Sequence, residues 1–312
     1  MAGAGKKQRA PRNRTLALTH GERKRLAKEI VQPGPEGAVR GVRDRIILGD
    51  ASDLLARLPE KKFDLLFADP PYNLDKSFGK KKFRKVGPEE YEKWLDSWLE
   101  PAARLLKPTA SVYICGDWRS SAAIQRAGSK HFILRNRITW EREKGRGSKT
   151  NWKNSSEDIW FFTVSDVYVF NPGDVMLKRR VIAPYREDGK PKDWEEHDDG
   201  RFRLTHPSNL WTDITVPFWS MPENTDHPTQ KPEKLLAKLI LASTEKGAMI
   251  LDPFLGSGTT AAAAKKLGRH FTGIEIDEDH CLLAAKRVEL AAKDKRIQGF
   301  EDGVFWDRNA RT

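Results

Sequence analysis

Cysteines and long apolar runs are scarce in this sequence, and acidic residues are fewer than basic ones. Its two cysteines, Cys115 and Cys281, form neither a disulfide framework nor the spacing of a metal site, so we expect no bound metal. No apolar run approaches the length of about 18 residues that a membrane-spanning helix requires. Residues 1–9 lack the apolar segment of a signal peptide, which predicts an intracellular protein with no membrane partner.

Basic residues outnumber acidic ones. The 312 residues include 56 lysines and arginines against 44 aspartates and glutamates, which gives a formal charge of +12. Such a balance favours a polyanionic partner, and nucleic acid is the first candidate. With 38% hydrophobic residues, the chain is long enough for a sizeable core in one large domain or in a domain with an insertion.

The first forty residues are expected to form a basic, partly disordered arm. Thr19 and Glu22 have the spacing of a capping box, which predicts a short helix over 22–31. Two interpretations of the arm remain open, namely contact with nucleic-acid phosphates or a solvated tail. Changes of composition further along the chain predict five regions, at 1–40, 41–170, 171–226, 227–295 and 296–312.

Apolar segments of strand type and of helix type alternate along the chain. The Trp and Leu residues between Tyr91 and Leu105 recur at helical spacing after Pro88, and we expect this stripe to pack in the core. The expected strands lie at 45–50, 65–68, 110–115, 132–140, 159–164, 167–170, 248–251 and 270–274. The other expected helices lie at 54–58, 233–243, through Leu267, and at 278–292. This alternation predicts an α/β fold with a mostly parallel sheet and helices on both faces.

One expected strand ends at an unusual corner, Asp69-Pro70-Pro71-Tyr72. Neither proline has a backbone N–H, and each fixes its φ near about −65°, so the chain cannot extend the sheet beyond this point. A carboxylate, a carbonyl and an aromatic ring are therefore presented at the carboxyl end of a strand, where open α/β sheets bind ligands. Taken alone, the stretch is equally a strand with a proline-rich turn.

A second motif combines a strand, a glycine-rich turn and a helix. The strand at 248–251 leads into Gly256-Ser257-Gly258, whose glycines allow the backbone to approach a ligand at the helix N-terminus. The next strand ends at Glu275, which is placed to bind ribose hydroxyls. No Gly-Lys-Ser/Thr follows the glycines, so the pair predicts a nucleoside pocket and disfavours a P-loop.

These motifs together resemble the S-adenosylmethionine-dependent DNA amino-methyltransferases. The resemblance rests on the Asp69 corner, on 252–259 and on 227–232 (His-Pro-Thr-Gln-Lys-Pro), and it covers about 46–288 outside the region near 175–220. The catalytic motif precedes the cofactor motif, as in the permuted beta group of the family. The resemblance implies a Rossmann-like methyltransferase fold with circularly permuted motifs and a small target-recognition insertion at 171–226.

The resemblance also implies roles for individual residues. Asp69 and the carbonyl of Pro70 would accept the N–H groups of a flipped-out base, and Tyr72 would stack on that base, without a metal or a covalent intermediate. Lys231 would face the cofactor carboxylate or be an ordinary surface lysine, and Asp50 would bind the adenine amino group or only start a helix. The other cofactor residues implied are Asp252, Phe254, Gly256, Gly258 and Thr259 at the methionine end, and Glu275 at the ribose.

Basic residues in two segments are candidates for DNA contacts. One set lies directly after the Asp69 corner and could clamp the strand beside the flipped base, although a solvated lysine-rich loop is the second interpretation. The second set lies in the insertion and could bind phosphates or read guanine. The candidates are Lys80, Lys81, Lys82 and Arg84 in the first segment and Arg179, Arg180, Arg186, Arg201 and Arg203 in the second.

The resulting hypothesis is a site-specific methyltransferase that acts on N6 of adenine in double-stranded DNA. Within the family, Asp-Pro-Pro-Tyr favours adenine, and cytosine N4 is the second candidate for the target. Two further hypotheses are an RNA or protein amide methyltransferase and an inactive DNA-binding module of the same fold. A homodimer and a cognate restriction endonuclease are the expected protein partners.

Overall fold

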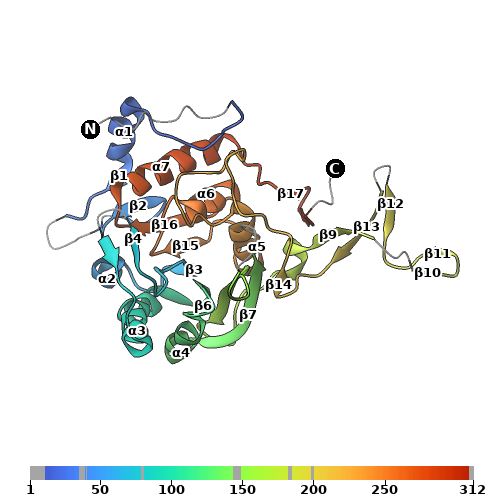
Figure 1. Cartoon of the computed structure of the whole chain (residues 1–312), viewed down its shortest axis with the longest axis horizontal. Helices are drawn as coiled ribbons and strands as arrows, with labels where there is room; N and C mark the ends of the chain where they lie inside the picture. Colours follow the sequence, from blue (N-terminus) through green and yellow to red (C-terminus); the bar gives the residue numbers. More distant parts are fainter. Residues whose placement is uncertain are drawn as a thin grey trace.

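A nine-stranded sheet forms the centre of the chain (Figure 1). The computed structural model describes residues 11–34, 39, 41–78, 81–142, 149–181, 185–197 and 200–308. Across the sheet the strands follow the order β1 (Ile30–Val31), β2 (Arg45–Leu48), β16 (His270–Glu275), β15 (Met249–Asp252), β3 (Phe63–Ala68), β6 (Leu106–Gly116), β8 (Ser156–Thr163), β7 (Ile133–Glu141) and β14 (Leu210–Trp211). Among these strands β8 alone pairs antiparallel with its neighbours, so the predicted mostly parallel α/β sheet is confirmed.

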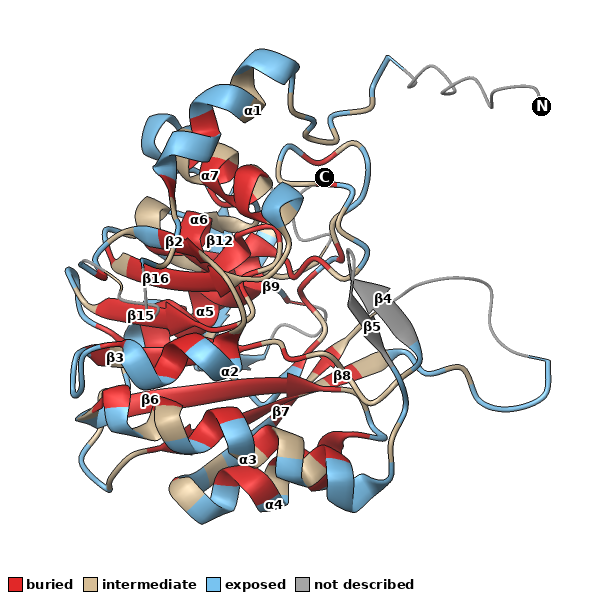
Figure 2. Ribbon diagram, turned by 90° about the vertical axis from the view of Figure 1, so that its left-hand side faces the viewer, coloured by how far each residue is buried: buried red, intermediate tan, exposed pale blue. Residues whose placement is uncertain are grey.

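Helices cover both faces of this sheet. One face carries α2 (Ala51–Leu54), α3 (Pro88–Leu105) and α4 (Ser121–His131). The other carries α5 (Glu233–Ser243), α6 (Thr259–Lys266) and α7 (Glu278–Lys293). Figure 2 shows β6, β15 and β16 buried along most of their length and α3 buried along one side, where most of its Trp and Leu stripe packs in the core as predicted.

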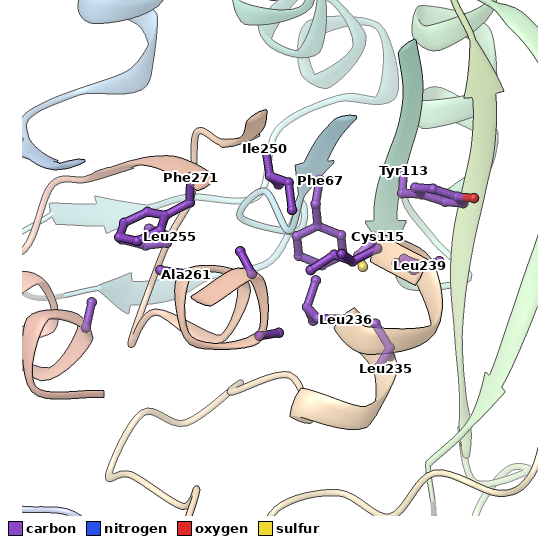
Figure 3. Close-up of a cluster of buried hydrophobic side chains, with 14 of the residues drawn as sticks. Phe67, Tyr113, Cys115, Leu235, Leu236, Leu239, Ile250, Leu255, Ala261 and Phe271 are labelled. Atoms are coloured by element: carbon purple, nitrogen blue, oxygen red, sulfur yellow. The ribbon is translucent and has the colours of Figure 1, made fainter. Parts of the chain in front are cut away.

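The central strands are apolar on both faces because helices cover both. Every residue of β15 is buried, and so are five of the six residues of β3. Figure 3 shows one of the two layers of the core, where Phe67 and Ile250 from these strands meet Leu235 and Leu236 of α5. The continuous apolar runs that predicted the strands are therefore a consequence of two-sided burial.

The predicted strand at 167–170 is wrong. In the structure these residues form no strand, and the rings of Tyr168 and Phe170 lie 6.0 and 6.2 Å from the ring of Phe161 on β8. The apolar residues of this segment are thus explained by packing against the sheet and not by pairing within it. The helix predicted over 22–31 is also shorter, with α1 at His20–Leu26, a turn of 3-10 helix at Ala27–Glu29, and β1 after it.

The described part of the N-terminal segment is attached to the body of the protein. The predicted capping box is present, with Thr19 and Glu22 bonded reciprocally at the start of α1. Leu26 and Ile30 are buried, and Ile30 belongs to the edge strand β1. Residues 15–34 are therefore structured, and a solvated tail does not describe them, whereas contact of the arm with DNA stays a prediction.

A second, five-stranded sheet combines the insertion with the end of the chain. Its order is β12 (Glu195–His197), β13 (Gly200–Thr205), β9 (Leu177–Arg180), β18 (Val304–Trp306) and β17 (Phe300–Glu301). Beyond it lies the hairpin of β10 (Arg186–Glu187) and β11 (Lys190–Pro191), and Figure 1 shows this part extending away from the main sheet. The regions expected at 171–226 and 296–312 thus share one sheet.

A small hairpin follows the Asp69 corner, formed by β4 (Lys76–Phe78) and β5 (Lys81–Phe83). Its base is fixed by Asn73, whose side-chain amide donates to the carbonyl of Val86 and accepts from its N–H, both at 2.8 Å. No helix among the described residues is both long enough and apolar enough to cross a membrane.

Candidate functional site

A cavity of about 260 Å³ lies where the carboxyl ends of β2, β3, β15 and β16 meet. This is the edge of a parallel sheet at which ligands are expected to bind. Of the residues predicted for catalysis and cofactor binding, those that line it are Asp50, Asp69, Pro70, Tyr72, Lys231, Asp252, Phe254, Gly256, Thr259 and Glu275. The two motifs, nearly two hundred residues apart in the sequence, therefore form one site.

The Asp69 corner is held from several sides. The strand β3 ends at Ala68, and the two prolines then direct the chain away from the sheet. Tyr91 of α3 donates a hydrogen bond of 3.0 Å to the carbonyl of Pro71. The hydroxyl of Tyr72 turns back and donates to Asp69 Oδ1 over 2.9 Å. The geometry of this corner is thus fixed by contacts with α3 as well as by the prolines themselves.

Lys231 bridges the Asp69 corner and a carboxylate on β8. Its Nζ lies 2.6 Å from Asp69 Oδ2, 2.7 Å from Glu157 Oε1 and 3.3 Å from the hydroxyl of Tyr72. The Tyr72 hydroxyl also lies within hydrogen-bond distance of Glu157, so Asp69 and Glu157 share its single proton. Arg142 Nη1 lies 2.5 Å from the other oxygen of Glu157. Lys231 is only 6% exposed, so the interpretation of this residue as an ordinary surface lysine is wrong.

Burial and charge act in opposite directions within this cluster. Burial disfavours the charged form of Lys231, but the carboxylates of Asp69 and Glu157 outweigh it and raise the lysine pKa. For Glu157 burial is outweighed by Lys231 and Arg142, so its pKa is lowered. Asp69 has no second cation, and burial together with Glu157 raises its pKa. Glu157 is therefore the more acidic of the two carboxylates.

The cluster also contains groups that could bind a metal ion. Ligand atoms of Asp69, Cys115 and Glu157 lie within 4.8 Å of one another. Cys115 is fully buried, and burial raises the pKa of its thiol far above the ordinary value. The Lys231 ammonium contacts both carboxylates, so it already supplies a positive charge at the oxygens that a metal ion would use.

The two glycines of the second motif serve different purposes. Gly256 has φ +54° and donates its N–H to Glu275 Oε2 over 2.8 Å. Gly258 has φ +84°, caps α6, and lies so close to α7 that a Cβ atom would be 2.5 Å from the Cβ of Ala284. Gly256 therefore shapes the wall of the cavity, whereas Gly258 allows α6 and α7 to pack closely.

Two carboxylates at strand ends face the cavity and also organise the backbone. Glu275 accepts the N–H of Asp277 at Oε1 over 2.8 Å. Asp50 caps α2 by accepting the N–H of Ser52 over 3.0 Å, and it lines the cavity as well. The two interpretations of Asp50 are thus compatible, because starting the helix aligns its carboxylate with the cavity wall.

Several residues of the site escaped the sequence analysis. Trp94 belongs to the helical stripe predicted as core, but it lines the cavity beside Phe254, with ring centroids 6.1 Å apart. His227 and His280 also line it, and their rings are 4.5 Å apart. Glu157 lies in a run that reads as an ordinary strand. His227 belongs to the motif at 227–232, but we expected no site role for it, and nothing in the local sequence distinguishes Glu157 or Trp94.

Of the residues predicted to bind DNA, those whose side chains the structure describes do not line this cavity. Lys80 lies outside the described residues, as do the side chains of Lys81 and Lys82 in β5, and Arg84 is exposed. Arg201 and Arg203 on β13 pair with Glu196 and Asp193, each at 3.1 Å. The others are placed as follows: Arg179 lies 3.8 Å from Asp307, Arg180 lies over the ring of Phe202, and Arg186 lies over the ring of Trp194.

Comparison with known proteins identifies relatives that are all named as DNA methylases or methyltransferases. The family model described as DNA methylase (N6_N4_Mtase) matches residues 63–286. The chain is 35% identical over 257 residues to the DNA adenine methyltransferase YhdJ of Escherichia coli, covering 79% of this chain and 83% of that protein. It is 30% identical to the type II methyltransferase M.BglII of Bacillus subtilis, covering 77% of this chain and 68% of that protein.

Solved structures agree with this fold. The crystal structure of the M1.HpyAVI–SAM complex aligns with a TM-score of 0.50 and 26% identity, covering 78% of this chain and 98% of that one. The PvuII DNA methyltransferase, described as cytosine-N4-specific, aligns with a TM-score of 0.57 and 20% identity, covering 78% and 85%.

Proposed function

The chain belongs to the N6/N4 DNA methylase family, and from this membership we propose that it transfers a methyl group from S-adenosylmethionine to N6 of adenine in duplex DNA. The observation that carries the proposal is the meeting of the Asp69 corner and the glycine turn in one cavity. The choice of adenine is supported by the Asp-Pro-Pro-Tyr sequence and by the relative named as a DNA adenine methyltransferase.

The chemistry of the cavity fits S-adenosylmethionine. Burial raises the pKa of Asp252 to about 7, and a cationic ligand group would stabilise its carboxylate. This suits the ammonium group at the methionine end, beside Gly256 and Thr259. Glu275 would accept ribose hydroxyls, and Asp50 would accept the adenine amino group between the apolar surfaces of Trp94 and Phe254. The ammonium group of Lys231 would face the carboxylate of the cofactor and neutralise its negative charge. Gly258 would act indirectly, by keeping the N-terminus of α6 close to α7.

When bound, the cofactor supplies an electrophilic methyl group on a sulfonium sulfur. The protein must then improve a poor nucleophile, because the lone pair of an exocyclic amine is delocalised into the base. Asp69 and the carbonyl of Pro70 would each accept one N–H and so direct the lone pair outward. As positive charge develops on the nitrogen, the Asp69 carboxylate stabilises it. Tyr72 would hold the flipped-out base by stacking, worth about 1–3 kcal/mol.

Cytosine N4 is the second candidate for the target. Its exocyclic amine has the same two N–H groups, so the acceptor pair of Asp69 and Pro70 suits both bases. A direct experiment separates them. Unmethylated DNA is incubated with the protein and labelled S-adenosylmethionine, and the nucleosides are identified by mass spectrometry. N6-methyladenine is the expected product, and N4-methylcytosine would select the second candidate. If no methyl group is transferred to any DNA, the proposed methyltransferase activity is excluded.

Partners follow from the same proposal. The DNA duplex would contact basic residues of the five-stranded sheet, such as Arg201, and of the two hairpins, such as Arg84 after β5 and Arg186 on β10. The enzyme would act inside the cell, where its DNA is. We also propose a homodimer, to be tested by sedimentation equilibrium. A cognate restriction endonuclease is proposed because M.BglII is named a type II methyltransferase. The corresponding test is whether DNA methylated by this protein resists an endonuclease encoded beside it.

A further inference from the structure

Glu157 is a buried carboxylate beside the Asp69 corner, and the proposed methyl transfer gives it no role. Its side chain is 1% exposed and projects from β8, the antiparallel strand of the sheet. It accepts from three donors, namely Lys231, Tyr72 and Arg142. Two of these three donors also contact Asp69.

Lys231 and Tyr72 thus contact both carboxylates. These shared contacts matter because, in the proposed reaction, Asp69 must accept a hydrogen bond from the target amine. In the structure Oδ1 of Asp69 accepts from Tyr72, and Oδ2 is paired with Lys231. A base that enters the site has to displace one of these donors. A buried donor that loses its acceptor is costly, and an unpaired buried ammonium is more so. A second acceptor within reach of both donors removes that cost.

We propose that Glu157 is a positioning residue for methyl transfer, which keeps Lys231 and Tyr72 beside Asp69 and retains their hydrogen bonds when Asp69 turns to the target amine. The inference rests on the proposed function. With its hydroxyl held by Glu157, the ring of Tyr72 keeps a defined orientation for stacking on the base. Arg142 fixes Glu157 in turn, since its guanidinium lies over the ring of Trp140 while it contacts the carboxylate.

The charges of the cluster are consistent with this role. Two carboxylates, Asp69 and Glu157, face two cations, Lys231 and Arg142. If Glu157 loses its charge, Lys231 can pair only with Asp69. The ammonium would then hold Asp69 more tightly and compete with the target amine. Loss of Glu157 should therefore slow the transfer step and leave cofactor binding little affected.

The first test compares Glu157→Gln with Asp158→Asn. Asp158 is the next residue on β8, has a side chain 13% exposed, and accepts from Ser121 and Thr139 on the other side of the sheet. For Glu157→Gln we expect kcat to fall by about 10- to 100-fold, with S-adenosylmethionine affinity by calorimetry unchanged within about 3-fold. Asp158→Asn should keep the wild-type kcat.

The second test is the pH profile of kcat/KM, whose acidic limb reports the ionisation of Asp69. The titratable or charged groups that face Asp69 are Tyr72, Tyr91, Cys115, Glu157, Lys231 and Asp252, with Arg142 behind Glu157. Glu157 raises the pKa of Asp69 and Lys231 lowers it, so Glu157→Gln should move the acidic limb to lower pH. A loss of packing alone would reduce the rate without moving that limb.

If Glu157→Gln folds poorly, the double variant with Lys231→Met is compared with Lys231→Met alone, because the double variant buries no unpaired ammonium. The double variant should be as slow as Lys231→Met alone. A Glu157→Gln enzyme with wild-type kcat, or a double variant clearly slower than Lys231→Met, would overturn the role of Glu157. Failure of the proposed function is distinguishable, because the wild-type protein would then methylate no DNA.

Discussion

The acceptor role proposed for Asp69 and the partly buried position of its side chain make different demands. The proposed role requires a charged carboxylate, yet desolvation and Glu157 raise its pKa and favour the protonated form. Lys231 compensates by direct contact at 2.6 Å. The reactive state of this residue is therefore set by its neighbours on α3, β8 and the loop before α5 more than by the proline corner alone.

Asp69→Ala should abolish turnover and preserve cofactor binding. The variant loses the group that orients the target amine and stabilises its positive charge, so we expect kcat to fall by at least about 10²- to 10³-fold. Cofactor affinity, measured by calorimetry, should stay within about 3-fold, since the groups assigned to the cofactor lie on other strands. Substantial residual methylation by this variant would show that Asp69 is not the acceptor.

Gly258→Ala should destabilise the protein much more than Gly268→Ala. Both glycines have positive φ, +84° and +72°, but a Cβ at Gly258 would meet Ala284 at 2.5 Å, whereas none of the described atoms lies within 4 Å of a Cβ at Gly268. The conformational cost common to both is about 1 kcal/mol. Overpacking should add about 1–3 kcal/mol at Gly258. Urea unfolding measures the stability of both variants. Equal losses of stability would show that a Cβ at Gly258 makes no close contact with α7.

The residues that sequence could and could not reveal differ in kind. Asp69 and Gly256 interrupt regular structure, and an interruption is visible in a sequence. Glu157 and Trp94 lie inside regular elements whose patterns predict core. Their contribution depends on which strand is antiparallel and on which side of α3 faces the cavity. Both are tertiary facts, and no local pattern encodes them.

At the level of elements, the N-terminal segment and the loop before α5 support each other. The N–H groups of Arg14 and Leu16 donate to Trp219 and Asn224 of that loop, at 2.7 and 2.8 Å. The helix α1 packs on α7, where Glu22 pairs with Lys286 at 2.6 Å. The same loop carries His227 and Lys231 to the cavity wall. The segment expected as a basic arm thus helps to fix one wall of the site.

Glu223 should make stability depend on pH through this loop. It accepts the N–H of Glu233 over 2.7 Å, and burial together with the charge of Glu233 raises its pKa to about 7 from 4.5. The folded protein therefore holds a proton that the unfolded chain releases, so its contribution is full below about pH 4.5 and is lost as pH rises to about 7. The loss of stability is about 3 kcal/mol.

Glu223→Gln removes this titration and keeps the acceptor oxygen. We expect equal stability near about pH 5 and a more stable variant near about pH 8, measured by urea unfolding. The contribution of Asp252, which has a similar pKa, is the same in both proteins and cancels. Curves that stay parallel across this range would show that Glu223 is not protonated in the fold.

The elements themselves were largely predictable, with one instructive error. Helix α5 and strand β16 follow from their apolar periodicity, and α3 begins at the proline that marked it. The strand expected at 167–170 fails because its aromatic residues pack onto β8. The small sheet could not be predicted, because it pairs β9 with β18, which lie more than a hundred residues apart.

At the level of the whole molecule, the excess positive charge is not evenly available for DNA. On the small sheet, Arg179, Arg201 and Arg203 each lie near a carboxylate, at 3.8, 3.1 and 3.1 Å. Exposed pairs of this kind are weak, so phosphates can replace the carboxylates at little cost. The family resemblance placed target recognition in this region, and the projecting β10–β11 hairpin in Figure 1 gives it a surface separate from the cavity.

The remaining charges that distinguish the two interpretations of the N-terminal arm lie in residues 1–11. A chain that begins at Arg12 loses Lys6, Lys7 and Arg9 but keeps α1 and the buried Leu26. If these three side chains contact phosphates, the slope of log affinity against log salt should fall by about 2–3, at about 0.9 per contact.

The matched control removes three charges at the opposite edge of the sheet, with Lys61, Lys62 and Lys246 changed to Gln. These lysines line a separate cavity at the amino ends of the central strands, away from the Asp69 corner. Fluorescence titrations of a labelled duplex at several salt concentrations compare the two variants with the full chain. If the arm contacts DNA, the slope should be smaller in the truncated protein than in the full chain and unchanged in the triple Gln variant. A slope unchanged by the truncation would mean that these three side chains make no phosphate contacts. Equal decreases in both variants would mean that the charges act only through the net charge of the molecule.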